Sequence, residues 1–260
     1  MQLQRFETTV SKAIRRVRPA PLAALLKHLL RIERRVHHTA HGTFWIDPVS
    51  NFGGAILASG EYERPMIDTL MRLLTKDGVF VDLGANEGYF SILAGIRVGP
   101  TGSVIAIEPQ ERLAPVIREN VRLNDLKNVK LVQSAISDKE GEATLYLLPD
   151  LNTGGSSFTK RTRYAVPTQT THTMTLEQLF DTHGLGHVDL LKVDIEGAEY
   201  EALMGSPAVF ANRRVKALAL ELHPAILAQR GKDSADIESF LAGHGYCRSP
   251  QFSTDVWLPH

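Results

Sequence analysis

Four carboxylates and one histidine follow or end short apolar runs of this chain, and they are the side chains best suited to chemistry. They are Asp82, Glu108, Asp194, Glu196 and His223. Short apolar runs of this kind predict buried parallel strands, whose carboxyl ends meet at one edge of a sheet. Because ligands of such sheets bind beyond that edge, we expect these side chains to surround one site. Carboxylates and imidazole there can accept protons and hydrogen bonds from a ligand.

A turn bracketed by glycines connects the first of these strands to a helix. Residues 79–83 form the apolar run, Gly84 and Gly88 bracket the turn, and an apolar helix follows. Free backbone N–H groups and the positive end of the helix favour a nucleotide at such a turn. Glu108 stands roughly 20 positions further on, where such folds place the acceptor for ribose hydroxyls. An ordinary strand–turn–helix unit is the alternative, but it leaves Asp82 and Glu108 unexplained.

Four stretches of the chain carry the pattern of a known family in the same order. They are residues 81–91 (VDLGANEGYFS), 107–109 (IEP), 135–141 (AISDKEG) and 191–199 (LKVDIEGAE). Together they resemble S-adenosylmethionine-dependent methyltransferases, and the FkbM-type family in particular. The resemblance covers residues 60–224, and four ordered matches are more specific than a single glycine motif.

The resemblance implies S-adenosylmethionine as the cofactor and a Rossmann-like class I methyltransferase fold. This is an α/β fold with a doubly wound, seven-stranded mixed sheet whose last strand is antiparallel, here preceded by an N-terminal helical extension. The alternation of predicted strands and helices independently favours a doubly wound sheet. By the same likeness, the cofactor contacts fall on Glu63, Asp82, Gly84, Asn86, Gly88, Phe90, Glu108, Pro109, Ser134, Ala135 and Asp194. A helix-capping role for Glu63 stays open as an alternative.

Methyl transfer from a sulfonium requires alignment of donor and acceptor, and removal of a proton when the acceptor is a hydroxyl. We expect His223 or Asp194 to be the general base, since histidine ordinarily titrates near neutrality, and Glu196 to orient the substrate. Glu196 can instead stabilise a helix N-terminus, and His223 can simply end a strand before a proline. Together with Glu221 these residues could ligate a divalent metal, but their spacing does not demand one, and we expect none.

The composition argues against several other classes of protein. Lysine plus arginine equals aspartate plus glutamate, at 29 each, which disfavours a general nucleic-acid binder. The single cysteine, Cys247, cannot form an internal disulfide or a cysteine-rich zinc site, and this favours the cytoplasm. No apolar run is long enough to span a membrane, and the N-terminal sequence lacks the apolar core of a signal peptide.

Residues 1–42 are predicted to form a basic amphipathic helical extension to a methyltransferase domain at residues 43–260. The extension carries nine lysines and arginines against two glutamates, and leucines recur at near-helical spacing over residues 21–37. Helix packing on the domain or in a dimer is one interpretation, and peripheral contact with an anionic lipid or a phosphorylated substrate is the other. Two short strands at 43–48 and 55–57, joined by a glycine-containing turn, are predicted to follow.

A long excursion precedes the fourth strand of the predicted sheet. Residues 142–148 and 168–174 alternate like a pair of strands, and the small residues at 152–157 lie between them. This small-residue segment is either part of a surface hairpin or a lid over the methyl donor. Nearby, three basic residues are either solvated or face an anionic substrate. They are Lys160, Arg161 and Arg163.

The predicted function is S-adenosylmethionine-dependent methylation of a small molecule, with a hydroxyl of a sugar, glycolipid or secondary metabolite as the expected acceptor. Nitrogen stays open as the acceptor atom, because nothing in the residues excludes it. A nicotinamide-dependent oxidoreductase is a weaker alternative, since the turn lacks the Gly-x-Gly-x-x-Gly pattern. A non-catalytic binding module that docks a partner through the basic N-terminal helix is disfavoured by intact Asp82, Glu108 and Asp194. The oligomeric state is left open.

Overall fold

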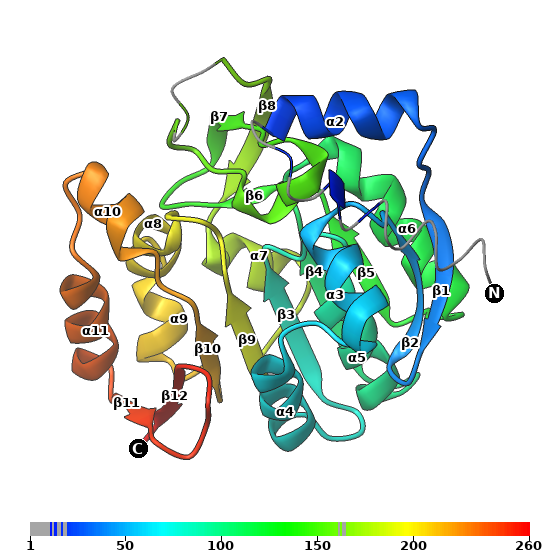
Figure 1. Ribbon diagram of the computed structural model, residues 1–260. Coiled ribbons are helices and arrows are strands. Elements are labelled where there is room, and N and C mark those ends of the chain that lie inside the picture. The colour runs from blue at the N-terminus through cyan, green and yellow to red at the C-terminus, as the bar shows by residue number, and fades with distance from the viewer. Residues whose placement is uncertain (1–10, 12, 15–16, 18–19, 161, 163–164) are drawn as a thin grey trace.

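The centre of the molecule is a sheet of seven strands in the order β11-β12-β10-β9-β3-β4-β5 (Figure 1). The computed structural model describes residues 11, 13–14, 17, 20–160, 162 and 165–260. The strands are β3 (Val79–Leu83), β4 (Ser103–Ile107), β5 (Val129–Val132), β9 (Leu190–Val193), β10 (Leu218–Leu220), β11 (Tyr246–Ser249) and β12 (Val256–Pro259). The ladders from β10 to β5 are parallel, whereas β12 is antiparallel to both of its neighbours. The predicted mixed sheet with an antiparallel last strand is confirmed.

Helices cover both faces of this sheet, because successive strand side chains point to opposite faces. In β3, Val81 and Leu83 join one apolar cluster and Phe80 joins the other. The first cluster includes side chains of α7 (Leu176–Thr182), α8 (Glu199–Met204), α9 (Pro207–Ala211), α10 (Pro224–Gln229) and α11 (Ser234–Gly243). The second includes α3 (Asn51–Ser59), α4 (Arg64–Leu73), α5 (Tyr89–Val98) and α6 (Ala114–Leu123). This double cover leaves the edge at the carboxyl ends of the parallel strands for ligands.

The segment before the sheet differs from the sequence-based prediction. Helix α2 spans only Ala20–Leu29, so the helix predicted over 21–37 is wrong in its second half. There, β1 (Arg35–Thr39) pairs antiparallel with β2 (Gly42–Ile46). Arg31 takes a positive φ of 49° just after α2, a conformation that a continuing helix excludes.

The strand predicted at 55–57 is also wrong, because these residues belong to α3. Ser50 caps this helix, and its Oγ accepts a hydrogen bond from the backbone N–H of Gly53 at 2.9 Å. A Cβ on Gly53 would lie 1.9 Å from the carbonyl oxygen of Asp47. The glycine therefore allows close packing at the start of a helix and does not form a hairpin turn.

Two asparagines one turn apart on α6 hold the edge of β2. The Oδ1 atom of Asn124 accepts a hydrogen bond from the N–H of Thr43 at 2.8 Å, and Oδ1 of Asn120 accepts one from Trp45 at 2.7 Å. Asn120 is fully buried, and its Nδ2 donates to the carbonyl of Glu87 at 2.8 Å. Side-chain amides thus take the place of a neighbouring strand and connect the β1–β2 hairpin to the glycine turn.

The N-terminal extension is in contact with the rest of the chain. Lys27 of α2 forms an ion pair with the buried Asp47, and Arg34 forms one with the buried Glu87. The boundary predicted at residue 42 falls within the β1–β2 hairpin, and the division into two parts stays a prediction. The exposed large apolar side chains of α2 and its end are Leu22, Leu25, Leu29 and Leu30. The predicted basic residues Arg5, Lys12, Arg15, Arg16 and Arg18 lie outside the described residues.

A second, three-stranded sheet forms the excursion between β5 and β9, in the order β6-β8-β7. Its strands are β6 (Ala135–Ile136), β7 (Gly141–Tyr146) and β8 (Thr168–Met174). The predicted strand pair is confirmed as the antiparallel β7–β8 ladder, and the short 3₁₀ helix η2 (Asp150–Gly155) follows β7. The predicted basic residues Arg161 and Arg163 lie outside the described residues. Within the described parts of the chain, we find no helix whose length and apolar character would suit a membrane crossing.

We predict that Asn120→Ala lowers the free energy of unfolding by roughly 1–3 kcal/mol, because it leaves the buried N–H of Trp45 and carbonyl of Glu87 unpaired. Urea denaturation monitored by circular dichroism measures this loss. Arg118→Ala, an exposed substitution on the same helix, is the control and should change the stability by less than about 0.5 kcal/mol. Equal effects of the two substitutions would contradict the role assigned to the asparagine.

Candidate functional site

A pocket opens beyond the carboxyl ends of β3, β4 and β9. Of the residues predicted to bind the cofactor, its wall includes Glu63, Gly84, Asn86, Phe90, Glu108, Pro109, Ala135 and Asp194. The other three, Asp82, Gly88 and Ser134, are not among the lining residues. Asp82 is fully buried, and Ser134 directs its hydroxyl to the carbonyl of His172 at 3.0 Å. Of the predicted catalytic residues, Asp194 and Glu196 line the pocket and His223 does not.

Gly84 and Gly88 are each required in the turn, but for different structural reasons. Gly84 has a φ of 82°, and a Cβ there would lie 1.9 Å from the carbonyl oxygen of Asp194. Glycine is therefore required for the close approach of the chain ends of β3 and β9. Gly88 has a φ of 83° and precedes α5 as its N-cap, where its missing side chain faces Ile117. Gly88 is therefore needed for its positive φ, which glycine adopts without steric cost.

Glu108 ends β4 with its carboxylate held in place by the backbone. Its Oε2 accepts a hydrogen bond from the N–H of Asn86 at 2.8 Å, and its Oε1 accepts one from Gln110 at 3.0 Å. Only 3% of Glu108 is exposed, and burial raises its pKa to about 7, although these hydrogen bonds oppose the shift. A carboxylate has about four lone pairs, so the two oxygens can each accept a further hydrogen bond from a ligand.

Lys192, which the sequence analysis did not select, joins two of the predicted residues. Its Nζ lies 3.4 Å from Oδ1 of Asp82 and 3.4 Å from Oδ2 of Asp194. Asp82 also accepts a hydrogen bond from the hydroxyl of Ser91 at 2.7 Å. Burial alone would lower the pKa of Lys192, but the charges of Asp194, Asp82 and Glu63 outweigh it and raise the pKa. A buried, charged lysine is therefore part of the pocket wall.

The excursion after β7 closes one side of the pocket. Asn152, Gly154 and Phe158 belong to the wall. In the same segment, Thr153 donates a hydrogen bond to Oδ1 of Asn86 at 2.8 Å, and Ser157 donates one to the carbonyl of Glu196 at 2.7 Å. The segment predicted as a hairpin or a lid thus contacts both the glycine turn and the chain after β9.

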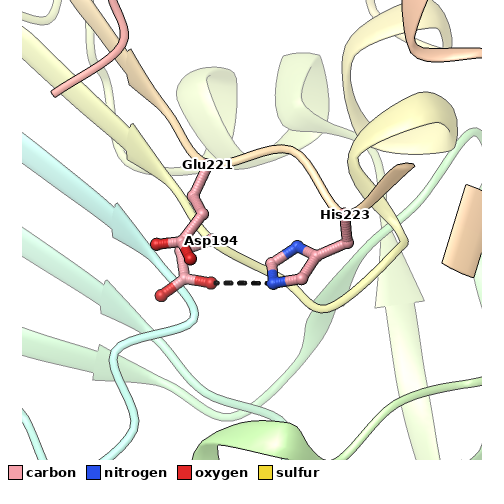
Figure 2. Close-up of side chains that lie close together, drawn as sticks. All are labelled: Asp194, Glu221 and His223. Carbon is pink, nitrogen blue, oxygen red and sulfur yellow. Dashed lines mark ion pairs between the residues drawn. The ribbon is translucent and has the colours of Figure 1, made fainter. Parts of the chain in front are cut away.

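His223 lies among carboxylates at the ends of β9 and β10 (Figure 2). Its Nε2 is 4.0 Å from Oδ1 of Asp194 and 3.6 Å from Oε2 of Glu196. Its Nδ1 is 2.9 Å from Oε1 of Glu199, which is fully buried. Burial lowers the pKa of His223, but the hydrogen bond and charge of Glu199, with Glu196 and Asp194, raise it to about 9. This differs from the sequence-based expectation of titration near neutrality.

A second hollow of about 460 Å³ adjoins the first pocket, which is within the size range of small-molecule sites. It lies beyond the end of β10, between α4, α11 and the loop before β12. Glu63, Lys192, Asp194 and Glu221 line both spaces. Burial and the charges of Asp194 and Glu63 raise the pKa of Glu221, and burial raises the pKa of Glu63. The shared wall is therefore crowded with carboxylates.

Several residues of the site were missed by sequence reasoning. Lys192 carried a signal, because a lysine inside the apolar run 189–193 must find charged partners if that run is a buried strand. Glu221 was considered only as a metal ligand. Gln110 carried no comparable signal, since only the tertiary fold brings it to the pocket, and Asn152 was included only as part of the segment 152–157.

We predict that Lys192→Met lowers the free energy of unfolding by roughly 3–5 kcal/mol, because it leaves the carboxylate of Asp82 buried without a cation. Lys216→Met is the matched control, since Lys216 pairs with Asp189 at 2.7 Å but is 55% exposed; its cost should stay below about 1 kcal/mol. The double variant Asp82→Asn/Lys192→Met should recover part of the loss. If the effects of Asp82→Asn and Lys192→Met on the free energy of unfolding are additive in urea denaturation, the buried ion pair of these two residues is contradicted.

Comparison with known proteins agrees with this geometry. A model of the methyltransferase FkbM domain matches residues 82–247. "Methyltransferase sdnD" of Sordaria araneosa is 32% identical over 161 residues, which cover 51% of this chain and 61% of that protein. "AMB antimetabolite synthetase AmbE" of Pseudomonas aeruginosa is 26% identical over 211 residues, 67% of this chain and 10% of that protein. The chain thus spans less than two thirds of either relative.

A solved structure of a methyltransferase FkbM from Methylobacillus flagellatus is similar, with a TM-score of 0.47 and 17% identity, over 72% of this chain and 44% of that one. The family match includes the glycine turn, Glu108, Lys192 and Asp194, and with it the nicotinamide-dependent alternative is set aside. The chain belongs to the FkbM methyltransferase family, whose members use S-adenosylmethionine as the cofactor.

Proposed function

We propose that the protein is an S-adenosylmethionine-dependent methyltransferase that acts on a hydroxyl of a small molecule, such as a sugar, a glycolipid or a secondary metabolite. The observation that carries the proposal is the wall of Glu63, Lys192, Asp194 and Glu221 shared by two adjoining hollows. A methyl donor in the first hollow and an acceptor in the second meet at this wall. The similarity to AmbE, named an antimetabolite synthetase, is consistent with a small-molecule acceptor.

The first pocket suits an adenosine group. Glu108 offers two backbone-oriented carboxylate oxygens to the ribose hydroxyls, which is a hydrogen-bond pattern that nucleotide-binding sheets commonly use. Pro109 and Ala135 offer apolar surface to the base, and Phe90 lies on the wall near Lys192. When bound, S-adenosylmethionine supplies a methyl group on a positively charged sulfur. The acidic shared wall favours that charge.

Asp194 is the proposed general base, because it lines both hollows, whereas His223 lines neither. Asp194 accepts the proton of the acceptor hydroxyl as that oxygen becomes methylated. Glu196 orients the acceptor from the wall of the first pocket, and Ser157 donates a hydrogen bond to its backbone carbonyl at 2.7 Å. His223 stays next to both carboxylates and holds them in place.

The charge of the site supports oxygen over nitrogen as the acceptor atom. Carboxylates stabilise a nearby ammonium and raise its pKa, so an amine in the second hollow would stay protonated and non-nucleophilic. A hydroxyl is neutral when it binds and can donate its hydrogen bond directly to a carboxylate. The same acidic wall therefore disfavours an amine and accepts an alcohol.

The segment of residues 152–157, which overlaps η2, is proposed as a lid over the donor. Its contacts from Thr153 to Asn86 and from Ser157 to Glu196 are single hydrogen bonds that can open and reform. Leu151 of η2 packs with Ala23 of α2, so the N-terminal helix supports the closed position.

We predict that nucleoside binding weakens as the pH falls through about 7, because the ionised Glu108 accepts two hydrogen bonds from the ribose and the protonated form does not. If only the ionised form binds, the dissociation constant at pH 6 is up to roughly tenfold larger than at pH 8. Methylthioadenosine is the suitable probe for calorimetry, since it lacks the titrating amino acid group of the full donor.

The variant Glu108→Gln is the control for this pH dependence. It should bind methylthioadenosine more weakly than the wild type at pH 8 and show no change between pH 6 and pH 8. A Gln variant that retains the pH dependence would show that another group titrates, and the ribose would then have to be placed elsewhere.

We predict that Asp194→Asn leaves the affinity for S-adenosylhomocysteine within about threefold and slows turnover by roughly 10²–10⁴-fold, the range of general-base effects. Methylation with radiolabelled donor across pools of sugars, lipid-linked sugars and secondary metabolites first identifies an acceptor. Asp255→Asn is the comparison for turnover, since Asp255 lines the second hollow but not the shared wall. Loss of S-adenosylhomocysteine binding together with turnover would make Asp194 a cofactor or folding residue.

A further inference from the structure

We infer that Asp194, Glu221 and His223 form a binding site for a divalent cation of the magnesium and manganese class. Oxygen ligands from carboxylates and one imidazole nitrogen are a donor set that such cations accept. The proximity of the three side chains supports the binding site itself, whereas the catalytic role of the cation rests on the proposed methylation of a hydroxyl.

The three side chains converge from the ends of two neighbouring strands. Figure 2 shows the carboxylates of Asp194 and Glu221 next to one another, with the imidazole of His223 directed toward them. One ligand atom from each residue can be chosen so that all lie within 4.8 Å of one another. Two ligands bound at about 2.2 Å to one cation lie at most about 4.4 Å apart, so a contraction of a few tenths of an ångström completes the set.

A buried residue outside the cluster fixes the histidine in the orientation of a metal ligand. Nδ1 of His223 is 2.9 Å from Oε1 of Glu199, and Glu199 has no exposed surface. This hydrogen bond occupies Nδ1 and leaves Nε2 on the side of Asp194. Metal-binding histidines commonly have such a carboxylate on the other ring nitrogen, where it sets the tautomer and the ring orientation. Since Glu199 cannot itself reach solvent, its placement points to a function for the ring that it holds.

The charge of the region also calls for a cation. Among the described residues, three carboxylates line both hollows, those of Glu63, Asp194 and Glu221, and Lys192 is the one cationic side chain that lines both with them. Lys192 is already engaged by Asp82 and Asp194. Glu221 is exposed to the hollow and accepts no hydrogen bond from any described residue.

A cation at this position would solve a chemical problem of the proposed reaction. Deprotonating a hydroxyl among carboxylates is costly, because the resulting alkoxide is repelled by them. A divalent cation that binds the hydroxyl oxygen lowers the pKa of that hydroxyl. The O–H bond then breaks with its proton passing to the second oxygen of Asp194, and the O–CH₃ bond forms as the S–CH₃ bond breaks with its electron pair left on sulfur.

The test is Mn²⁺ binding to the full chain without donor or acceptor, measured by electron paramagnetic resonance of the free ion. We expect one site per chain in the wild type. Glu221→Gln and His223→Asn should each raise the dissociation constant at least tenfold. Glu238→Gln is the matched control, since Glu238 lines the same hollow outside the cluster and should leave Mn²⁺ binding unchanged.

Calorimetry with S-adenosylhomocysteine on each variant checks that the donor pocket is folded. No Mn²⁺ binding by a chain that binds S-adenosylhomocysteine would overturn the cation site and leave the proposed function standing. An equal loss of Mn²⁺ affinity in Glu221→Gln and Glu238→Gln would also overturn the cation site, because such a result indicates only a diffuse acidic surface. Conversely, tight Mn²⁺ binding with no methylation of any hydroxyl compound, with or without added Mn²⁺, would keep the site and reject the hydroxyl acceptor.

Discussion

The buried charge of Lys192 is the interaction on which the arrangement of the site depends. Lys192 stands directly opposite Asp82 in the parallel register of β9 and β3, so the ladder itself places an ammonium beside a fully buried carboxylate. A buried cation is stable only when paired, and here one partner lies inside the sheet while the other, Asp194, lies at its edge. The position of Asp194 is therefore set by strand register and not by a flexible loop, which is the precision that a reacting group needs.

The backbone adds a second constraint at the same place. Gly84 lies so close to the carbonyl of Asp194 that no larger residue fits, and the turn after β3 is thereby held against the chain after β9. Asn86 continues this turn, and its N–H binds Glu108 at the end of β4. One turn thus connects the ends of β3, β4 and β9. Lys192 and the carboxylates of Glu108 and Asp194 therefore line one pocket together with this turn.

Much of the sheet could be predicted from the sequence, because β3, β4 and β9 are short apolar runs and the helix after the turn is apolar along its length. The strand-end rule also brought Glu108 and Asp194 to the pocket. Ala135 lines the pocket and Ser134 does not, because β6 begins at Ala135 and pairs with β8, and the cofactor contact of Ser134 stays a prediction. The strand predicted at 55–57 was wrong because glycines suggest a turn, whereas Gly53 allows close packing against the carbonyl of Asp47. These outcomes depend on contacts distant in sequence, which local patterns do not contain.

The site has two sides with different electrostatic character. On the donor side, Glu108 is surrounded by backbone N–H groups and its pKa is raised mainly by burial, so it is suited to neutral ribose hydroxyls. On the other side, burial raises the pKa of Glu63, and burial with the charges of Asp194 and Glu63 raises the pKa of Glu221, so that side is suited to a cation or to a hydroxyl bound to one. Lys192 lines both spaces and separates these two environments. Its burial between Asp82 and Asp194 is therefore what lets the proposed nucleoside site and the proposed acceptor site share one wall.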